Sequence, residues 1–309
     1  MKAPNYKLIG VIVTLLGAIG FSGKAILVKM AYRDTDVDTI SLLALRMLFS
    51  LPFFLGMAFF ASKQTGNINL TTKEWFSVVV IGLFGYYISS FLDFWGLQFI
   101  SAGLERLILF TYPTMVVFFG AIIYKKRISK FQLLALLLSY AGIAIAFAAD
   151  IKMSNNSNVV LGSLLVFTCA FTYAIYVFSS GQIIPKIGTV KFTSYAMLAA
   201  TVGILLHYLF RNKFQFHLLH FAPKVYWYSI IMAVFTTVLP SLFVSEGIKR
   251  IGSSNVAIVS SIGPLATVAQ AYFFLQEPFG WQQAAGTALV VVGVILLGRK
   301  LSKEENKIA

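Results

Sequence analysis

Charged residues are scarce in this chain. They make up 12% of the 309 residues, whereas a soluble domain carries roughly 25%. With so few charges and 58% apolar residues, the chain cannot cover a water-exposed surface, and this excludes a soluble globular protein. The composition predicts an integral membrane protein, so the lipid bilayer is its first expected partner.

Cysteine is nearly absent as well, since Cys169 is the single one in the sequence. One cysteine cannot form an internal disulfide, which excludes a disulfide framework. The three histidines lack metal-ligand spacing, and the sequence contains no phosphate-binding glycine loop and no nucleophile elbow. The sequence therefore predicts no catalytic residue, no metal site and no cofactor, and it does not point to an enzyme.

Acidic residues are few, with 11 Asp and Glu against 25 Lys and Arg. The basic residues lie in short stretches between apolar runs and form no recognition module, so nucleic acid is not an expected partner. Long apolar runs are abundant instead, and a helix needs about 20 such residues to cross the hydrocarbon core. Ten runs are candidate spans: 8–31, 39–61, 75–99, 103–124, 131–149, 160–180, 192–210, 226–248, 255–274 and 281–298.

The distribution of Lys and Arg predicts the topology of these spans. One side of the membrane receives 16 of these residues, the other side receives 6, with Arg106 among them, and 3 fall inside spans. Cytoplasmic loops carry the excess of Lys and Arg. We therefore expect both termini in the cytoplasm and a location in the plasma membrane, which in a bacterium is the inner membrane.

The sequence also repeats internally. Residues 75–149 align without gaps on residues 226–300 when they are shifted by 151 positions. The alignment places glycines and prolines in register: Gly96 with Gly247, Pro113 with Pro264, and Gly142 with Gly293. The repeat predicts two units of five helices each, residues 1–153 and residues 154–309.

Because five is odd, the second unit must enter the membrane in the opposite sense to the first. Inverted repeats of this kind are typical of transporters, with the substrate site near the midplane between the units. The expected fold is an all-α membrane protein of ten transmembrane helices, arranged as two inverted five-helix repeats.

A family resemblance supports this fold. The runs Gly103 to Pro113 and Ser254 to Pro264, with the segment around Glu277, resemble the two EamA repeats of the drug/metabolite transporter superfamily. The resemblance covers nearly the whole chain and implies ten helices, two inverted repeats and a carrier, often an exporter. It does not specify the substrate. Lys126 departs from the pattern, because the first repeat of the family often has an acidic residue there.

Charged residues inside membrane spans are costly and are functional candidates. The four of interest are Lys24, Arg46, Asp93 and Glu105. At about 1.5 Å rise per residue, the first three lie roughly 10 Å below the outer ends of their spans. Glu105 lies nearer the outer end, so we expect all four in one layer with no net charge.

This layer has two interpretations. In the first, it lines a wet cavity for substrate, Asp93 pairs with Arg46, and Asp93 couples transport to H+ because it lies deeper than Glu105. In the second, the charges form a structural salt bridge and Lys24 snorkels outward. Helical spacing places Tyr86 on the face of Asp93 and Tyr112 on the face of Glu105, which adds both tyrosines to the candidate site.

Pro113 and Pro264 lie within matching spans of the two halves. Each proline removes one backbone hydrogen bond and kinks its helix. Paired helix breaks in the two halves of a transporter point to the binding site. The alternative is a packing kink with no role in binding.

The leading hypothesis is a secondary transporter of a small polar metabolite such as an amino acid, by alternating access between the repeats. The family resemblance implies an exporter. A zwitterion satisfies both signs of charge in the layer, whereas a lipophilic cation faces Lys24 and Arg46 as like charges. The alternatives are an exporter of cationic compounds, a polytopic membrane enzyme and a channel. The sequence leaves the substrate and the oligomeric state open.

Overall fold

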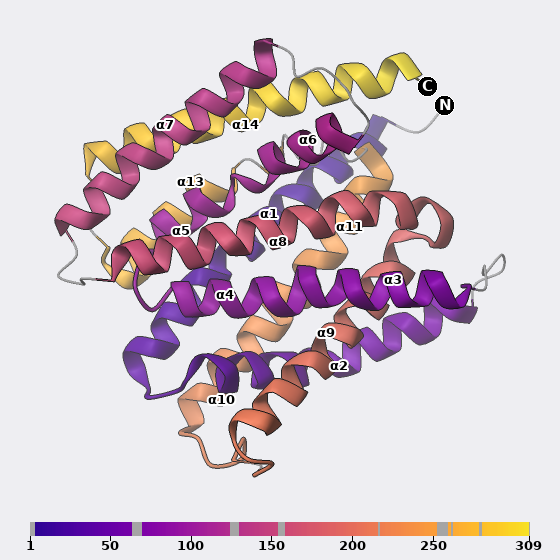
Figure 1. Ribbon diagram of the computed structural model, residues 1–309, viewed down its shortest axis with the longest axis vertical. Helices are drawn as coiled ribbons and strands as arrows, with labels where there is room; N and C mark the ends of the chain where they lie inside the picture. The colour runs from indigo at the N-terminus through magenta and orange to yellow at the C-terminus, as the bar shows by residue number, and fades with distance from the viewer. Residues whose placement is uncertain are drawn as a thin grey trace.

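A computed structural model describes residues 4–63, 70–123, 130–153, 158–215, 217–251, 259–260, 262–277 and 280–308. Every element in this part of the chain is a helix, as Figure 1 shows and as the sequence predicts. The first half contains α1 (Pro4–Asp34), α2 (Thr39–Lys63), α3 (Thr72–Gly82), the π-helical turn η1 (Leu83–Ile88), α4 (Ser89–Gly96), α5 (Ala102–Leu109), α6 (Tyr112–Ile123) and α7 (Lys130–Met153). The second half contains α8 (Val159–Ile187), α9 (Thr189–Arg211), α10 (Pro223–Ala233), η2 (Val234–Val238), α11 (Leu239–Ile251), α13 (Gly263–Gln270), η3 (Ala271–Leu275) and α14 (Trp281–Ile308).

Seven helices in the described part are long and apolar enough to cross a membrane, when α3 to α4, α5 to α6 and α10 to α11 are each counted as one. The predicted spans 131–149, 255–274 and 281–298 are not among the seven. In the first of these, α7 supplies a shorter apolar helix, Leu137–Ala149. The other two run through residues or side chains outside the described part. The count of ten spans therefore stays a prediction.

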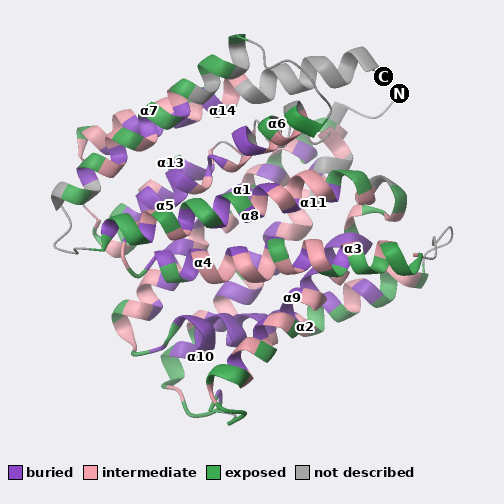
Figure 2. Cartoon of the chain, viewed as in Figure 1, coloured by how far each residue is buried: buried purple, intermediate pink, exposed green. Residues whose placement is uncertain are grey.

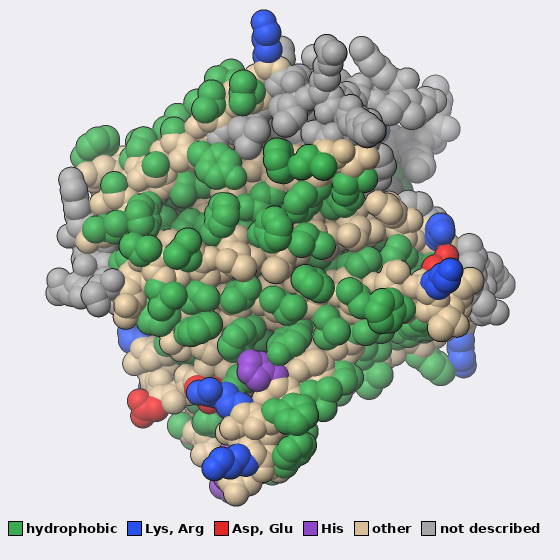
Figure 3. All heavy atoms as spheres, in the orientation of Figure 1, with side chains coloured by type: hydrophobic (Ala, Val, Ile, Leu, Met, Phe, Trp, Pro, Cys, Tyr) green, Lys and Arg blue, Asp and Glu red, His purple; other side chains and the backbone are tan. Residues whose placement is uncertain are grey.

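The surface is apolar where a bilayer would contact it. Hydrophobic side chains cover the middle of the face in Figure 3, and the charged side chains gather toward its edges. Large rings point outward from several helices: Phe60 of α2, Phe76 of α3 and Phe210 of α9 are each 65% to 70% exposed. Such a surface is compatible with lipid, and with the seven apolar helices it identifies an integral membrane protein.

Local sequence signals position the ends of the helices. Thr71 and Glu74 form a reciprocal capping box at the start of α3. The Leu104 N–H donates to the Ser101 hydroxyl, 3.0 Å away, which caps α5. Gly188 joins α8 to α9 with φ of +84°, a conformation that favours glycine.

Helix boundaries repeat with the same 151-residue spacing as the sequence. The matching starts are Thr72 and Pro223, Leu83 and Val234, Tyr112 and Gly263, and Lys130 and Trp281. The second pair begins the π-helical turns η1 and η2, and such turns are rare insertions in α-helices. A rare local conformation at the same position of both halves indicates that the repeat extends from sequence to backbone geometry.

The two halves pack against each other along most of their length. Helix α1 packs against α11, α2 against α9, α4 against α8, α5 against α13, and α7 against α14. Figure 1 shows the last pair side by side at one edge. The buried residues lie mainly between these helices, as Figure 2 shows. The largest apolar cluster includes Phe54, Phe94, Met197, Tyr208 and Met232.

The contact between α7 and α14 depends on glycine at position 142. A Cβ atom on Gly142 would lie 2.5 Å from the backbone oxygen of Gly286, which cannot move aside as a side chain can. We expect Gly142→Ala to lower the free energy of unfolding by about 1–3 kcal/mol. Thermal unfolding of the purified protein measures this. Gly56→Ala is the matched control, because a Cβ there meets nothing within 4 Å. Equal stability of the two variants would contradict the close contact.

Candidate functional site

Three of the four predicted intramembrane charges meet between α1, α4 and α5. The ammonium of Lys24 donates to Asp93 Oδ2 at 2.5 Å and lies 3.9 Å from Glu105 Oε1. The side chains of Asp93 and Glu105 are 1% and 0% exposed, and that of Lys24 is 17% exposed. Two carboxyl groups therefore share one close cation inside the protein. We call Lys24, Asp93 and Glu105 the charge cluster.

Arg46 lies close to the charge cluster but not in it. Its guanidinium stands 5.1 Å from the centre of the Phe94 ring, and its residue is 5% exposed. The ion pair expected between Arg46 and Asp93 is absent from the ion pairs of the described residues, because Lys24 holds the Asp93 carboxylate instead. Phe94 follows Asp93 in α4, so Arg46 lies against the helix that carries Asp93. The Nε and Nη1 atoms of Arg46 have no hydrogen-bond partner in the described part of the chain.

Arg106 is a further buried charge, which the topology count included on the outer side and did not single out as a site residue. It lies in α5 and is 9% exposed. Its guanidinium stands 5.1 Å from the centre of the Phe110 ring and packs beside Gly263 at the start of α13. The signal was present, since residue 106 lies inside the span predicted at 103–124. Cys169 was also missed; it is buried, 3% exposed, in α8, which packs against α4 and α5.

Tyr86 and Tyr112, the two predicted tyrosines, are linked by a ladder of rings. The hydroxyl of Tyr86 is 2.8 Å from that of Tyr176, and the rings of Tyr176 and Tyr173 stack at 5.6 Å. Tyr173 then meets Tyr112 edge to face, with ring centres 5.0 Å apart. The two linking tyrosines come from α8, in the second half. The sequence could not place them, because helical spacing relates residues of one helix only.

The two predicted helix breaks differ from simple kinks. Helix α5 ends at Leu109 and α6 begins at Tyr112, so Pro113 is the second residue of a new helix; its side chain lies outside those described. Pro264 likewise stands in the first turn of α13 and is buried. Proline lacks the N–H that a helix interior needs but fits a first turn, which is why the chain restarts there.

The break in the second half is bound by a side chain from the first. The Ser22 hydroxyl of α1 lies 3.0 Å from the carbonyl oxygen of Gly263. In the first half, the Thr114 hydroxyl donates to the Thr111 carbonyl at 2.6 Å. In each half, a hydroxyl group thus lies within hydrogen-bond distance of a backbone carbonyl at the break.

Comparison with known proteins places this architecture in a family. The sequence pattern of the EamA-like transporter family matches residues 8–148 and again residues 160–299. This chain belongs to the EamA-like transporter family. The family assignment confirms the resemblance found in the sequence, and it identifies a membrane transporter whose partners are a small-molecule substrate and the bilayer.

Relatives of this EamA-like transporter are themselves named transporters. One is the "Uncharacterized transporter YcbK" of Bacillus subtilis (strain 168), 28% identical over 304 residues, which is 96% of each chain. An "Uncharacterized transporter" of Archaeoglobus fulgidus is 23% identical over 283 residues, or 91% of this chain and 94% of the relative. A solved crystal structure matches with a TM-score of 0.65 and 16% identity, covering 94% of this chain and 98% of that one. This last likeness concerns the fold alone.

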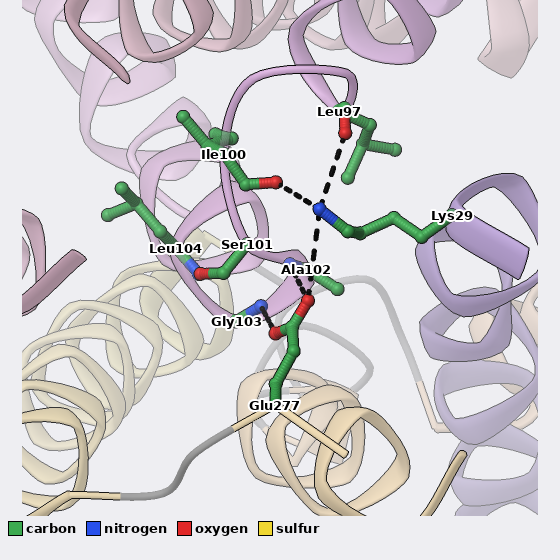
Figure 4. Close-up of polar contacts among 8 residues, drawn as sticks. All are labelled: Lys29, Leu97, Ile100, Ser101, Ala102, Gly103, Leu104 and Glu277. Atoms are coloured by element: carbon green, nitrogen blue, oxygen red, sulfur yellow. Dashed lines mark hydrogen bonds and ion pairs between the residues drawn. The ribbon is translucent and has the colours of Figure 1, made fainter. Parts of the chain in front are cut away.

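The two segments that match the EamA-like family are joined by a polar network, drawn in Figure 4. Glu277, from the second segment, accepts hydrogen bonds from the N–H groups of Ala102 at 3.0 Å and Gly103 at 3.5 Å. Its Oε1 atom lies 3.9 Å from the ammonium of Lys29. That ammonium also donates to the carbonyl oxygen of Ile100 at 2.7 Å. We call the contacts of Lys29 and Glu277 the latch network.

A cavity of about 510 Å³ lies beyond the latch network. It is lined by residues that include Lys29, Arg33, Asp36 and Gln98. Along α1, the order is the charge cluster at Lys24, the latch network at Lys29 and then the cavity. The segment from α4 to α5 has the same order. Asp93 and Glu105 of the charge cluster lie furthest from its turn, Ile100 and Ala102 of the latch network lie nearer, and Gln98 of the cavity lies at the turn. Along both segments of this EamA-like transporter, the residues of the latch network therefore lie between those of the cavity and those of the charge cluster.

Proposed function

We propose that the protein is a secondary transporter of a small polar metabolite, an amino acid or a related zwitterion, by alternating access between two inverted five-helix repeats. The observation that carries this proposal is the charge cluster with Arg46 beside it, buried where the halves meet. Charged groups at membrane depth that are held by protein mark substrate and ion pathways. Export is the direction that the family resemblance implies.

The pairing of helices supports inverted repeats. We take α1 to α7 as the five spans of the first half and α8 to α14 as the five spans of the second. The contact of α1 with α11 then joins the first span of one half to the third span of the other, and the contact of α8 with α4 does the same. The pairs α2 with α9, α5 with α13 and α7 with α14 each join equivalent spans. Such a pattern has the pseudo-two-fold relation of transporters that rock one repeat against the other.

The position of the chain ends supports an even number of spans. The start of α1 and the end of α14 lie at the same end of the bundle, and the α1–α2 turn lies at the other (Figure 1). With the excess of Lys and Arg on the side of the termini, we place both termini in the cytoplasm. The latch network and the cavity then face outward, and we propose that the latch network closes the outer path to the charge cluster.

Loss of the Glu277 carboxylate is expected to open this path. Hydrogen bonds to a charged group contribute about 1.5–3 kcal/mol, so we expect Glu277→Gln to raise the population open to the outside about tenfold or more. The native Cys169, 3% exposed in the helix α8 that packs against α4 and α5, is the reporter. The measurement is its rate of modification by a membrane-impermeant thiol reagent added outside intact cells.

Glu246→Gln is the matched control for this prediction. It removes a carboxylate of similar length whose partner is Arg250, four residues along the same helix and 2.6 Å away. We expect Cys169 to react in this variant at the wild-type rate. An unchanged rate in Glu277→Gln as well would show that the latch network does not control outer access.

Flux in proteoliposomes tests the proposed function. Purified protein in sealed vesicles should move labelled amino acids and show counterflow, in which an unlabelled substrate inside accelerates uptake of the labelled one. A channel would give flux without counterflow, and an enzyme would alter its substrate without moving it. Efficient transport of quaternary ammonium dyes with no competition by amino acids would show that the substrate is a cationic compound and not a zwitterion.

A further inference from the structure

Glu105 is the least compensated charge in the charge cluster. Its side chain is fully buried, and neither carboxyl oxygen has a hydrogen-bond partner among the described residues. The ammonium of Lys24 lies 3.9 Å away and donates to Asp93 at 2.5 Å instead. Glu105 thus lies beside a cation that another carboxylate already holds.

The groups around Glu105 come from several helices. Lys24 of α1 lies 3.9 Å from it, Asp93 of α4 holds that same lysine, and Arg106 follows it in α5. Helix α8, which carries Cys169, also packs against α5. Helix α13, which packs against α5 as well, carries no ionisable residue. Arg106 turns its guanidinium over the Phe110 ring. In α7 and α14, none of the described side chains forms a hydrogen bond with Glu105.

Two negative carboxylates around one ammonium are unfavourable in a desolvated site. Burial of an isolated carboxylate costs so much that such a group takes up a proton instead, and a neighbouring like charge acts in the same direction. The ammonium of Lys24 donates to Asp93, whereas it lies 3.9 Å from Glu105. This difference in contacts makes Glu105 the carboxyl group that is better suited to hold a proton.

We propose that Glu105, rather than Asp93, is the proton-carrying group of the transport cycle, and that Asp93 is the fixed counter-ion of Lys24. The inference rests on the proposed transport function and reverses the order expected from depth in the membrane. When one side opens, the Glu105 O–H bond breaks and its proton passes to entering water. The carboxylate left behind is stabilised by Lys24 until a proton from water on the other side restores the acid.

Infrared spectroscopy tests the protonation state without any substrate. The full-length protein in lipid at neutral pH should show the C=O stretch of a protonated carboxylic acid, which is distinct from carboxylate bands. Glu105→Gln should remove that band, and Glu246→Gln, at a carboxylate paired with Arg250 away from the cluster, should leave it. Absence of the band in the wild type, or its persistence in Glu105→Gln, would overturn the proposal.

Flux tests the coupling role. In proteoliposomes with labelled amino acids, a pH gradient should drive accumulation by the wild type and by Glu246→Gln, and Glu105→Gln should lose this gradient-driven accumulation. Gradient-driven accumulation by Glu105→Gln would overturn the proposal. Should the wild type move no amino acid at all, the proposed substrate class fails, and the infrared band alone then decides whether Glu105 holds the proton.

Discussion

Replacement of Asp93 by Asn is expected to lower the free energy of unfolding by roughly 3–5 kcal/mol, because it leaves the ammonium of Lys24 buried without its closest anion. The Lys24–Asp93 contact, at 2.5 Å, is the shortest ion pair described in the chain. Thermal or denaturant unfolding of purified protein measures the change. Arg250→Gln is a suitable reference, since it breaks an ion pair in which Glu246 is 36% exposed and should cost no more than about 1 kcal/mol.

A double-mutant cycle identifies the partner of Asp93. Removing both members of a buried pair can be nearly neutral where removing one is costly. The double variant Lys24→Met with Asp93→Asn should therefore be more stable than the sum of the single changes predicts. The cycle of Asp93→Asn with Arg46→Gln should show a smaller coupling energy, because those two side chains share no ion pair. Equal coupling in both cycles would mean that Asp93 is held by the two cations jointly.

The sequence was a good guide to which residues are buried together and a poor guide to which of them pair. Membrane depth follows from counting residues along a helix, and it correctly brought Lys24, Asp93 and Glu105 into one layer. Pairing depends on how the helices are rotated and how far each side chain reaches. These come from packing between α1, α4 and α5 that no single-helix periodicity contains. Hence Lys24, and not Arg46, holds Asp93.

The repeat was predictable because its signal is local. Proline fixes φ and removes a backbone donor, and glycine permits conformations and close contacts that other residues do not. Their 151-residue register in the sequence therefore returns as matching helix starts at Tyr112 and Gly263. The form of the breaks was less predictable. A proline in an apolar run fits a kinked helix as well as two shorter ones, and the structure contains two helices in the first half, α5 and α6.

The latch network lay outside what one sequence could give. Lys29 and Glu277 are 248 positions apart, and the latch network consists largely of backbone groups, the N–H groups of Ala102 and Gly103 and the carbonyl of Ile100. Every residue except proline has a backbone N–H group, so the sequence does not indicate which of these groups bind a distant side chain. A hint existed in the departure at Lys126, which the 151-residue register pairs with Glu277. Lys126 lies outside the described residues, so only the asymmetry of the sequence can be stated.

Arg46→Gln is expected to weaken substrate binding about ten- to a hundred-fold while the protein stays folded. Arg46 is buried, and two of its nitrogen atoms have no partner among the described residues. Its removal leaves no opposite charge uncovered at ion-pair distance. A buried guanidinium with unpartnered nitrogen atoms is suited to bind a substrate carboxylate. Hydrogen bonds to a charged group contribute about 1.5–3 kcal/mol. Since about 1.4 kcal/mol corresponds to a tenfold change in affinity, their loss gives the expected ten- to hundred-fold weakening.

Arg106 supplies the matched control for Arg46. Both guanidinium groups stand 5.1 Å from the centre of a phenylalanine ring. Arg106 packs beside Gly263, where α13 starts, so Arg106→Gln should lower the unfolding temperature. The KM for amino-acid counterflow by the protein that remains folded should change little. Arg46→Gln should do the reverse, raising the KM for amino-acid counterflow at an unchanged unfolding temperature. Amino-acid counterflow with a wild-type KM in Arg46→Gln would show that the carboxylate is bound elsewhere.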